Sequence, residues 1–245
     1  MIEVKNISFS YDEEHAVLND VSLSVKKGEN LGIIGPNGAG KTTFFYLLCG
    51  ILKPDNGEIR INNRIIKNAE FNPETGFVFQ NPDDQLFNIS VYEDIAFGPV
   101  NMGLGKDEVE QRTAESMEIT GIQHLAERPP HHLSGGEKRM AAIASVIAMK
   151  PQLMIYDEPT SNLDMRGRRR VIDFINSSKH TNLIASHDLE FILETCERVI
   201  IIDNGGIVTD GDTSTVMYDE ELMLRHGMER PHSLLHKKKE HIHSH

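Results

Sequence analysis

A run of glycines followed by a lysine and two threonines lies between two apolar segments. Its residues are Gly35, Pro36, Asn37, Gly38, Ala39, Gly40, Lys41, Thr42 and Thr43. Residues 31–34 predict a buried strand before the run, and residues 44–48 continue a helix that Lys41 opens. Glycines lack a Cβ, so backbone N–H groups can close around a phosphate, and the helix N-terminus adds donors and the positive end of its dipole. The run therefore predicts a bound nucleoside triphosphate, with Lys41 at its β- and γ-phosphates and Thr42 at Mg²⁺.

The phosphate loop alone does not separate GTPases, kinases and transport ATPases. It also has a simpler interpretation, a glycine-rich turn with a surface lysine. The strand before it and the helix after it favour a nucleotide site. The sequence contains no Asn-Lys-x-Asp motif for reading guanine, which argues against a GTPase and for ATP.

Two adjacent carboxylates follow the apolar strand predicted at residues 153–156. They are Asp157 and Glu158, and the end of a strand is where an α/β sheet presents its ligands. Asp157 is expected to hold Mg²⁺ through its water shell, and Glu158 to polarise the attacking water. A solvated acidic pair is the simpler alternative, and the phosphate loop elsewhere in the chain disfavours it.

A second loop of the same kind precedes the helix predicted at residues 137–149. It contains Ser134, Gly135 and Gly136, so it combines a hydroxyl, flexible glycines and a helix N-terminus. One triphosphate cannot easily use two such sites in one compact fold. We therefore expect this loop to meet a nucleotide held by another subunit, although an ordinary helix N-cap would have the same sequence.

Three single residues could complete the site. His187 follows the strand predicted at residues 183–185 and could contact the γ-phosphate. Gln80 also follows a strand, and its amide could bind Mg²⁺ or the attacking water. Tyr11 could stack on adenine, and an ordinary loop aromatic is the alternative.

Strands and helices alternate along most of the chain, which predicts an α/β fold with a parallel sheet covered on both sides. We expect a nucleotide-binding core with a β subdomain at 1–80, a helical subdomain at 81–150, the remainder of the core at 151–225 and a tail at 226–245. Helices are predicted at 91–97, 106–120 and 137–149 in the helical part. Asn62-Asn63 signals a hairpin in the β part.

The composition restricts partners and compartment. The chain has 245 residues, is 39% hydrophobic and carries a net charge of −12, which disfavours a nucleic-acid partner. No apolar run is long enough to span a membrane, and the first residues do not resemble a signal peptide, so we expect a cytoplasmic protein. Cys49 and Cys196 are expected to be reduced core thiols.

These motifs, in this order, resemble the ATPase subunit of an ABC transporter over residues 2–217. The resemblance implies a P-loop NTPase core with a mostly parallel sheet, an antiparallel β subdomain and an inserted helical subdomain. It also implies a head-to-tail dimer that holds two ATP molecules, with Lys41 and Thr42 of one chain facing Ser134 and Gly136 of the other. In the same family Glu158 is the catalytic base, and Asp164 lies near the dimer seam.

Residues 78–87 and 93–99 resemble the energy-coupling factor branch of importers, and residues 128–140 are similar to its cobalt/nickel members. That branch implies a homodimer on the cytoplasmic face of the cell membrane, bound to a transmembrane coupling protein and a membrane substrate-binding protein. Asp83 and Asp84 could pair with basic residues of the coupling protein. Tyr156 and Met165 depart from the family pattern without removing a catalytic group.

The substrate stays open at this stage, because substrate choice belongs to a separate subunit. Cobalt or nickel is favoured, and a vitamin importer of the same branch is the alternative. A soluble ABC protein acting on DNA or ribosomes and an ATP-dependent metal regulator fit less well. The last twenty residues are rich in histidine and could bind Co²⁺, Ni²⁺ or Zn²⁺ or form a solvated tail without regular structure; the histidines are His226, His232, His236, His241, His243 and His245.

Overall fold

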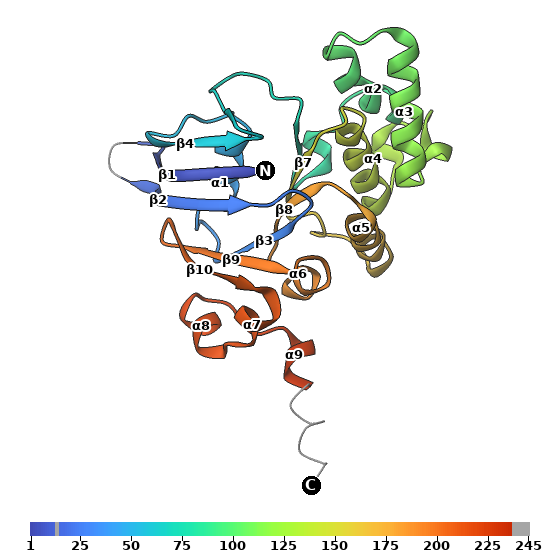
Figure 1. Ribbon diagram of the computed structural model, residues 1–245. Helices are drawn as coiled ribbons and strands as arrows, with labels where there is room; N and C mark the ends of the chain where they lie inside the picture. The colour runs from blue at the N-terminus through green and yellow to red at the C-terminus, as the bar shows by residue number, and fades with distance from the viewer. Residues whose placement is uncertain (13–14, 237–245) are drawn as a thin grey trace. The chain divides into compact units, whose positions relative to one another are not determined.

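The computed structural model describes residues 1–12 and 15–236 and divides the chain into two compact units (Figure 1). The first unit comprises residues 1–71 and 183–245, and the second comprises residues 72–182. The division falls within strand β8 (Thr181–Ala185). The two units are described separately below.

An antiparallel sheet forms the N-terminal part of the first unit. It contains β1 (Ile2–Ser10), β2 (Ala16–Val25), β4 (Asn56–Ile61) and β5 (Arg64–Ile65), in the order β2-β1-β4-β5. Apolar residues alternate with exposed ones along β1, so one face is buried. Asn62 and Asn63 join β4 to β5 with φ of 49° and 64°, the left-handed pair that a tight hairpin turn requires. The predicted hairpin is confirmed.

The rest of the first unit surrounds parallel strands. β3 (Asn30–Ile34) pairs in parallel with β9 (Arg198–Asp203), and β10 (Gly206–Asp212) pairs antiparallel with β9. The middle of β9 is wholly buried, as a strand covered on both faces should be. The helices of this unit are α1 (Lys41–Leu48), α6 (Leu189–Thr195), α7 (Thr213–Tyr218), α8 (Glu220–Arg225) and α9 (His232–His236).

The second unit combines a parallel strand pair with most of the chain's longer helices. β6 (Thr75–Val78) pairs with β7 (Leu153–Asp157), and α5 (Met165–Ser177) follows β7. Short 3-10 helices lie at Pro82–Asp84, Gln123–Leu125 and Pro130–His132. The three predicted helices are observed as α2 (Val91–Asn101), α3 (Lys106–Thr120) and α4 (Gly135–Ile147).

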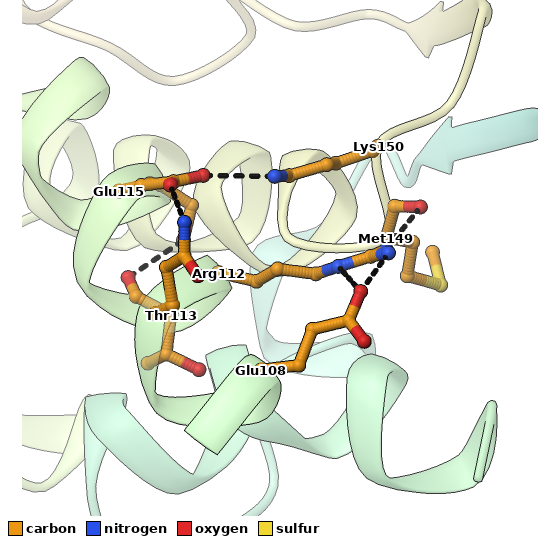
Figure 2. Close-up of polar contacts among 8 residues, drawn as sticks. Glu108, Arg112, Thr113, Glu115, Met149 and Lys150 are labelled. Carbon is orange, nitrogen blue, oxygen red and sulfur yellow. Dashed lines mark hydrogen bonds and ion pairs between the residues drawn. The ribbon is translucent and has the colours of Figure 1, made fainter. Parts of the chain in front are cut away.

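Helices α3 and α4 are joined near the C-terminal end of α4 (Figure 2). Arg112 pairs with Glu108 on α3 and donates to the Met149 carbonyl at 3.4 Å. The Lys150 ammonium lies 2.9 Å from a Glu115 carboxylate oxygen. These contacts fix one end of α4 and leave its N-terminal end to other partners.

The chain's last described segment packs on the first unit. His226 Nδ1 lies 2.7 Å from an Asp203 carboxylate oxygen, Ser233 bonds both carboxylate oxygens of Glu190, and Leu234 is buried. Regular structure therefore extends into residues 226–236, where the sequence suggested none, because these residues find polar partners on β9 and α6. His241, His243 and His245 lie outside the described residues.

Two further expectations concern thiols and membrane spans. Cys49 and Cys196 are free, as predicted, and burial raises the pKa of both thiols to about 12. Within residues 1–12 and 15–236, no helix combines the length and apolar character needed to cross a bilayer.

Candidate functional site

The phosphate loop begins where β3 ends. Gly35 has φ of 145°, and a Cβ built on it would lie 2.0 Å from the Ile202 carbonyl oxygen, so only glycine fits. Gly40, with φ of 100°, is the N-cap of α1, and a Cβ there would lie 2.9 Å from the Leu18 side chain. Neighbouring atoms therefore lie so close to the chain at both ends of the loop that they leave no room for a side chain.

Lys41 closes this loop from inside. Its side chain is buried, and its Nζ donates to the carbonyls of Gly35 at 2.7 Å and Pro36 at 2.9 Å. The N-cap of α1 is Gly40, which has no side chain with which to cap the helix. A loop curled around an ammonium at an uncapped helix start is suited to an anion such as a phosphate.

Tyr11 lies beside the phosphate loop. Its hydroxyl is 3.2 Å from the Thr43 hydroxyl in the first turn of α1, and its ring meets Phe9 edge-on at 5.0 Å between centroids. The Tyr11 side chain is nevertheless 62% exposed. The hydroxyl end of the ring is thus held next to the loop, while much of the residue remains accessible for stacking.

His187 shares a cavity with the start of the phosphate loop. The cavity has a volume of about 380 Å³ and is lined by Gly35, residues 186–190 and residues 227–232. Within the first unit the structure thus brings together Tyr11, the phosphate loop and His187.

The paired carboxylates lie at the end of β7 in the second unit. Asp157 and Glu158 are 5% and 9% exposed. Glu158 has φ of 49°, a left-handed backbone that costs a non-glycine residue free energy and is common at functional sites. The Ser161 N–H donates to the Glu158 carbonyl at 3.1 Å, which turns the chain sharply after the strand.

Ser134 begins α4 with a complete capping box. Its hydroxyl accepts from the Glu137 N–H at 3.4 Å, and a Glu137 carboxylate oxygen accepts from the Ser134 N–H at 2.9 Å. The Ser134 backbone and hydroxyl hydrogen bonds hold the pKa of Glu137 below its usual value. The predicted helix N-cap is therefore present, and Ser134 is exposed.

Asp164 lies close to the glycines of this loop. Its side chain caps α5 by accepting from the Gly167 N–H at 2.7 Å. A Cβ on Gly136 would lie 3.2 Å from the Gly167 Cα. A cavity of about 390 Å³ is lined by Ser134, Gly135, Gly136, Asp164 and neighbouring residues that include Arg166 and Arg170. Two arginines beside a serine and glycines make this hollow compatible with an anionic ligand.

Gln80 lies in another cavity of the second unit, of about 360 Å³. Residues 80–83, 161–163 and part of α4 line it. We call residues 79–85 the glutamine segment. Lys138 Nζ lies 2.6 Å from an Asp83 carboxylate oxygen. Asp83 therefore has a basic partner within the chain, whereas the sequence suggested a basic partner on a coupling protein.

Arg139 is a residue that sequence reasoning missed. It is 1% exposed, and it donates to the carbonyls of Phe79 at 2.6 Å and Gln80 at 2.7 Å. Burial lowers the pKa of its guanidinium to about 10, while the charge of Asp157 acts in the opposite direction. An arginine in a charged helical run reads as a surface residue, so nothing in the sequence marked it.

Comparisons with known proteins agree with this arrangement. A family profile described as ABC transporter matches residues 18–161. The energy-coupling factor transporter ATP-binding protein EcfA of Methanothermobacter thermautotrophicus is 43% identical over 239 residues, covering 94% of this chain and 77% of that protein.

Two solved structures are also similar. CbiO1 from Clostridium perfringens, described as part of the ABC transporter complex CbiONQ, has 34% identity and a TM-score of 0.80, covering 91% of this chain and 93% of that one. A dimeric ATP-binding cassette in a post-hydrolysis state, bound to ADP and phosphate, has 25% identity and a TM-score of 0.75, covering 87% of this chain and 99% of that one. The predicted α/β fold is confirmed, and the chain belongs to the ABC transporter family as an ATP-hydrolysing subunit of the energy-coupling factor type.

Proposed function

We propose that this ATPase drives the import of Co²⁺ or Ni²⁺ across the cell membrane. The phosphate loop is the observation that supports nucleotide binding. Gly35 leaves no room for a side chain, and the buried Lys41 donates to the carbonyls of Gly35 and Pro36. The similarity to CbiO1 and the resemblance of residues 128–140 to cobalt/nickel importers support the choice of substrate.

The proposed nucleotide contacts follow from chemistry. Residues 35–43 would bind the phosphates, with Lys41 neutralising the charge that develops during hydrolysis. Tyr11 would stack on adenine, using the exposed face of its ring. Glu158 would polarise the attacking water, and His187 would contact the γ-phosphate.

Thr42, Gln80 and Asp157 are the proposed ligands of Mg²⁺. A hydroxyl, an amide oxygen and a carboxylate are the hard oxygen donors that this ion prefers, and the 5% exposure of Asp157 suits a carboxylate held for a cation. Bound Mg²⁺ would supply charge neutralisation and orientation of the phosphates.

Two copies of the chain are proposed to act as a head-to-tail homodimer. Ser134, Gly135, Gly136 and Asp164 would contact the nucleotide held by the partner. The dimeric, ADP-bound structural neighbour supports this assembly. The cavity that these four residues line, with Arg166 and Arg170 beside it, supports an anionic ligand there.

Membrane attachment is proposed to come from protein partners: a transmembrane coupling protein and a membrane substrate-binding protein. The ATPase would lie on the cytoplasmic face of the membrane. The similarity to an energy-coupling factor ATPase supports this assignment, and a net charge of −12 argues against a nucleic-acid partner.

The substrate assignment is tested by mass spectrometry of proteins that co-purify with the chain from mildly solubilised native membranes. We expect a coupling protein together with a metal-type substrate-binding subunit, and ATP-dependent uptake of radioactive Co²⁺ or Ni²⁺ by vesicles containing the complex. A vitamin-type binding subunit would overturn the substrate and keep the mechanism. Co-purification without any integral membrane protein would overturn the transport role.

The role of Glu158 is tested with Glu158→Gln. We expect this variant to form ATP-bound dimers and to hydrolyse ATP at least about 100-fold more slowly than the wild type, because the amide is a poor base. Dimer formation is measured by light scattering and hydrolysis by phosphate release. Rapid hydrolysis by the variant would remove Glu158 from its proposed role.

A further inference from the structure

The glutamine segment is attached along one face of α4. The Gln85 side-chain amide donates to the Ala142 carbonyl at 2.7 Å and to the Ser145 hydroxyl at 2.9 Å. Together with Lys138, which binds Asp83, these contacts occupy helix positions i, i+4 and i+7, which lie above one another on the same face. The Phe79 N–H in turn donates to the Gln85 side-chain amide oxygen, Oε1, at 3.2 Å. Several polar contacts therefore hold the segment against the helix.

Arg139 is the buried centre of this attachment. Its two terminal nitrogens bind two consecutive carbonyls, those of Phe79 and Gln80, immediately after the end of β6. A planar guanidinium can hold two neighbouring acceptors at once, and a lysine ammonium presents no such fixed fork. The backbone of Gln80 is thus fixed by a side chain that belongs to the helix beginning at Gly135.

Placing a guanidinium here is costly. Arg139 is 1% exposed, and its Nε has no hydrogen-bond partner among the described residues. An apolar side chain would fill the same helix position without losing hydration. The lost hydration of the guanidinium is offset by its bonds to the two carbonyls and by the negative charge of Asp157. The arginine therefore orients this part of the chain more than it stabilises the core.

We propose that Arg139 is a positioning residue for Gln80 and that it makes the glutamine segment and α4 move as one body. The proposal rests on the proposed role of Gln80 in the site. A partner that displaces residues 81–85 would then also displace Ser134 and Gly135 at the start of α4. The same contact would carry movement from the signature loop, residues 134–136, back to Gln80.

The test is a double-mutant cycle on ATP hydrolysis by the whole chain assembled with its membrane partners. Arg139→Met keeps the volume and removes the donors, and we expect it to lower kcat by about 10- to 100-fold with little change in KM, because a misplaced group costs about that much. Arg139→Lys should restore part of the loss. In the Gln80→Ala background Arg139→Met should have no further effect, because both changes disable the same group.

Multiplicative effects of Gln80→Ala and Arg139→Met would overturn the proposal, since Arg139 would then act independently of Gln80. A wild-type rate for Gln80→Ala would overturn both the role of Gln80 and the positioning role. ATP binding is measured for every variant. If binding stays intact while either of these results is obtained, the positioning role fails and the proposed nucleotide site is retained. If Arg139→Met does not fold, Arg139→Lys and Gln85→Leu replace it in the same cycle, with the same expected lack of effect in the Gln80→Ala background.

Arg112→Met is the matched control. Arg112 also binds a backbone carbonyl near α4, that of Met149, but it does so beyond the C-terminal end of the helix (Figure 2). Removing its guanidinium should leave kcat within about 2-fold of the wild type, because its partners, Glu108 and Met149, lie outside the glutamine segment. A loss as large as that of Arg139→Met would mean that general loosening of α4, and not positioning of Gln80, lowers the rate.

Discussion

Helices α1 and α4 both have glycines at their N-terminal ends, before the first residue of α1 and as the first two residues of α4, and the two starts are built differently. The N-cap of α1 is Gly40 in a left-handed conformation, and among the described residues no side chain caps the helix. The N-cap of α4 is Ser134, which exchanges three hydrogen bonds with Glu137, two of them to its carboxylate. The first helix start therefore has no side-chain acceptor at its N-cap, whereas the second satisfies the N–H groups of Ser134 and Glu137 through side chains.

This difference fits a division of labour between the two loops. A helix start without a side-chain cap has no competing side-chain acceptor at its N-cap when a phosphate binds, while at a capped one the phosphate competes with the cap for the capped N–H groups. Residues 35–43 are thus suited to bind a nucleotide within one chain. Residues 134–136 are suited to join a nucleotide that is already bound, as the proposed head-to-tail dimer requires.

The largest expected effect is that of Lys41→Met. Removing one preorganised electrostatic group from a transition state costs about 10²- to 10³-fold in rate, and we expect at least this loss in phosphate release at saturating ATP. Ser134→Ala is the comparison, and it should leave ATP binding by the dilute, isolated chain unchanged. Equal losses of monomer ATP binding in both variants would contradict the division of labour.

The next largest expected effect is the loss of stability when a methyl group is added at Gly35. Gly35→Ala places a Cβ 2.0 Å from the Ile202 carbonyl oxygen, and we expect a loss of about 3 kcal/mol or more in the free energy of unfolding, measured with denaturant. Gly135→Ala is the matched change at the second loop, where the nearest atoms are 3.7 Å away. It should be neutral or slightly stabilising, because alanine favours the helix. A similar loss at both positions would show that the loops are equally tight.

The sequence predicted the phosphate loop because glycine spacing, a preceding apolar strand and a following helix all have local signatures. The hairpin at Asn62-Asn63 and helices α2 to α4 were predictable for the same reason, since periodicity and turn residues act over a few positions. Strand β10 and helices α7 and α8 were not predicted. β10 has no buried residue and its placement depends on pairing with β9, and α7 and α8 have only six residues each.

Arg139 shows why the rest of the site was not predictable. Its role depends on carbonyls about sixty positions earlier in the chain, and the residue type alone gives no indication of burial. The pairing of Asp83 with Lys138 is a similar case, because the sequence favoured an external partner for Asp83. Contacts of this kind come from tertiary packing, which local patterns do not record.

A smaller effect is expected for the ring beside the first loop. Tyr11→Ala should weaken ATP binding about 10-fold, a typical loss when an aromatic platform under a base is removed. Tyr11→Phe keeps the ring and removes the hydroxyl contact with Thr43, so it should bind ATP nearly as well as the wild type. Titration calorimetry with a non-hydrolysable ATP analogue measures both. A larger loss in Tyr11→Phe would assign the effect to the hydroxyl instead of stacking.

The smallest expected effect concerns the cap of the second loop and its dependence on pH. Ser134→Ala should lower the free energy of unfolding by about 1 kcal/mol at pH 7, a typical cost of losing an N-cap. The pKa of Glu137 is below its usual value of 4.5 because Ser134 binds the carboxylate, so this part of the stabilisation is present above pH 4.5 and is lost as pH falls through the folded-state pKa. The difference between wild type and variant should therefore shrink in acid, as measured by denaturant unfolding at pH 7 and pH 3.

Ser90→Ala is the matched control for that pH dependence. Ser90 caps α2 by accepting from the Glu93 N–H at 3.3 Å, and its neutral hydroxyl does not titrate. The cost of removing it should be about 1 kcal/mol at both pH values. If the Ser134→Ala difference stays constant between pH 7 and pH 3 as well, the bond from the Ser134 hydroxyl to the Glu137 carboxylate does not contribute to the cap. The hydroxyl would then act only as the acceptor of the Glu137 N–H, and the contrast with the start of α1 would be weaker than the hydrogen bonds indicate.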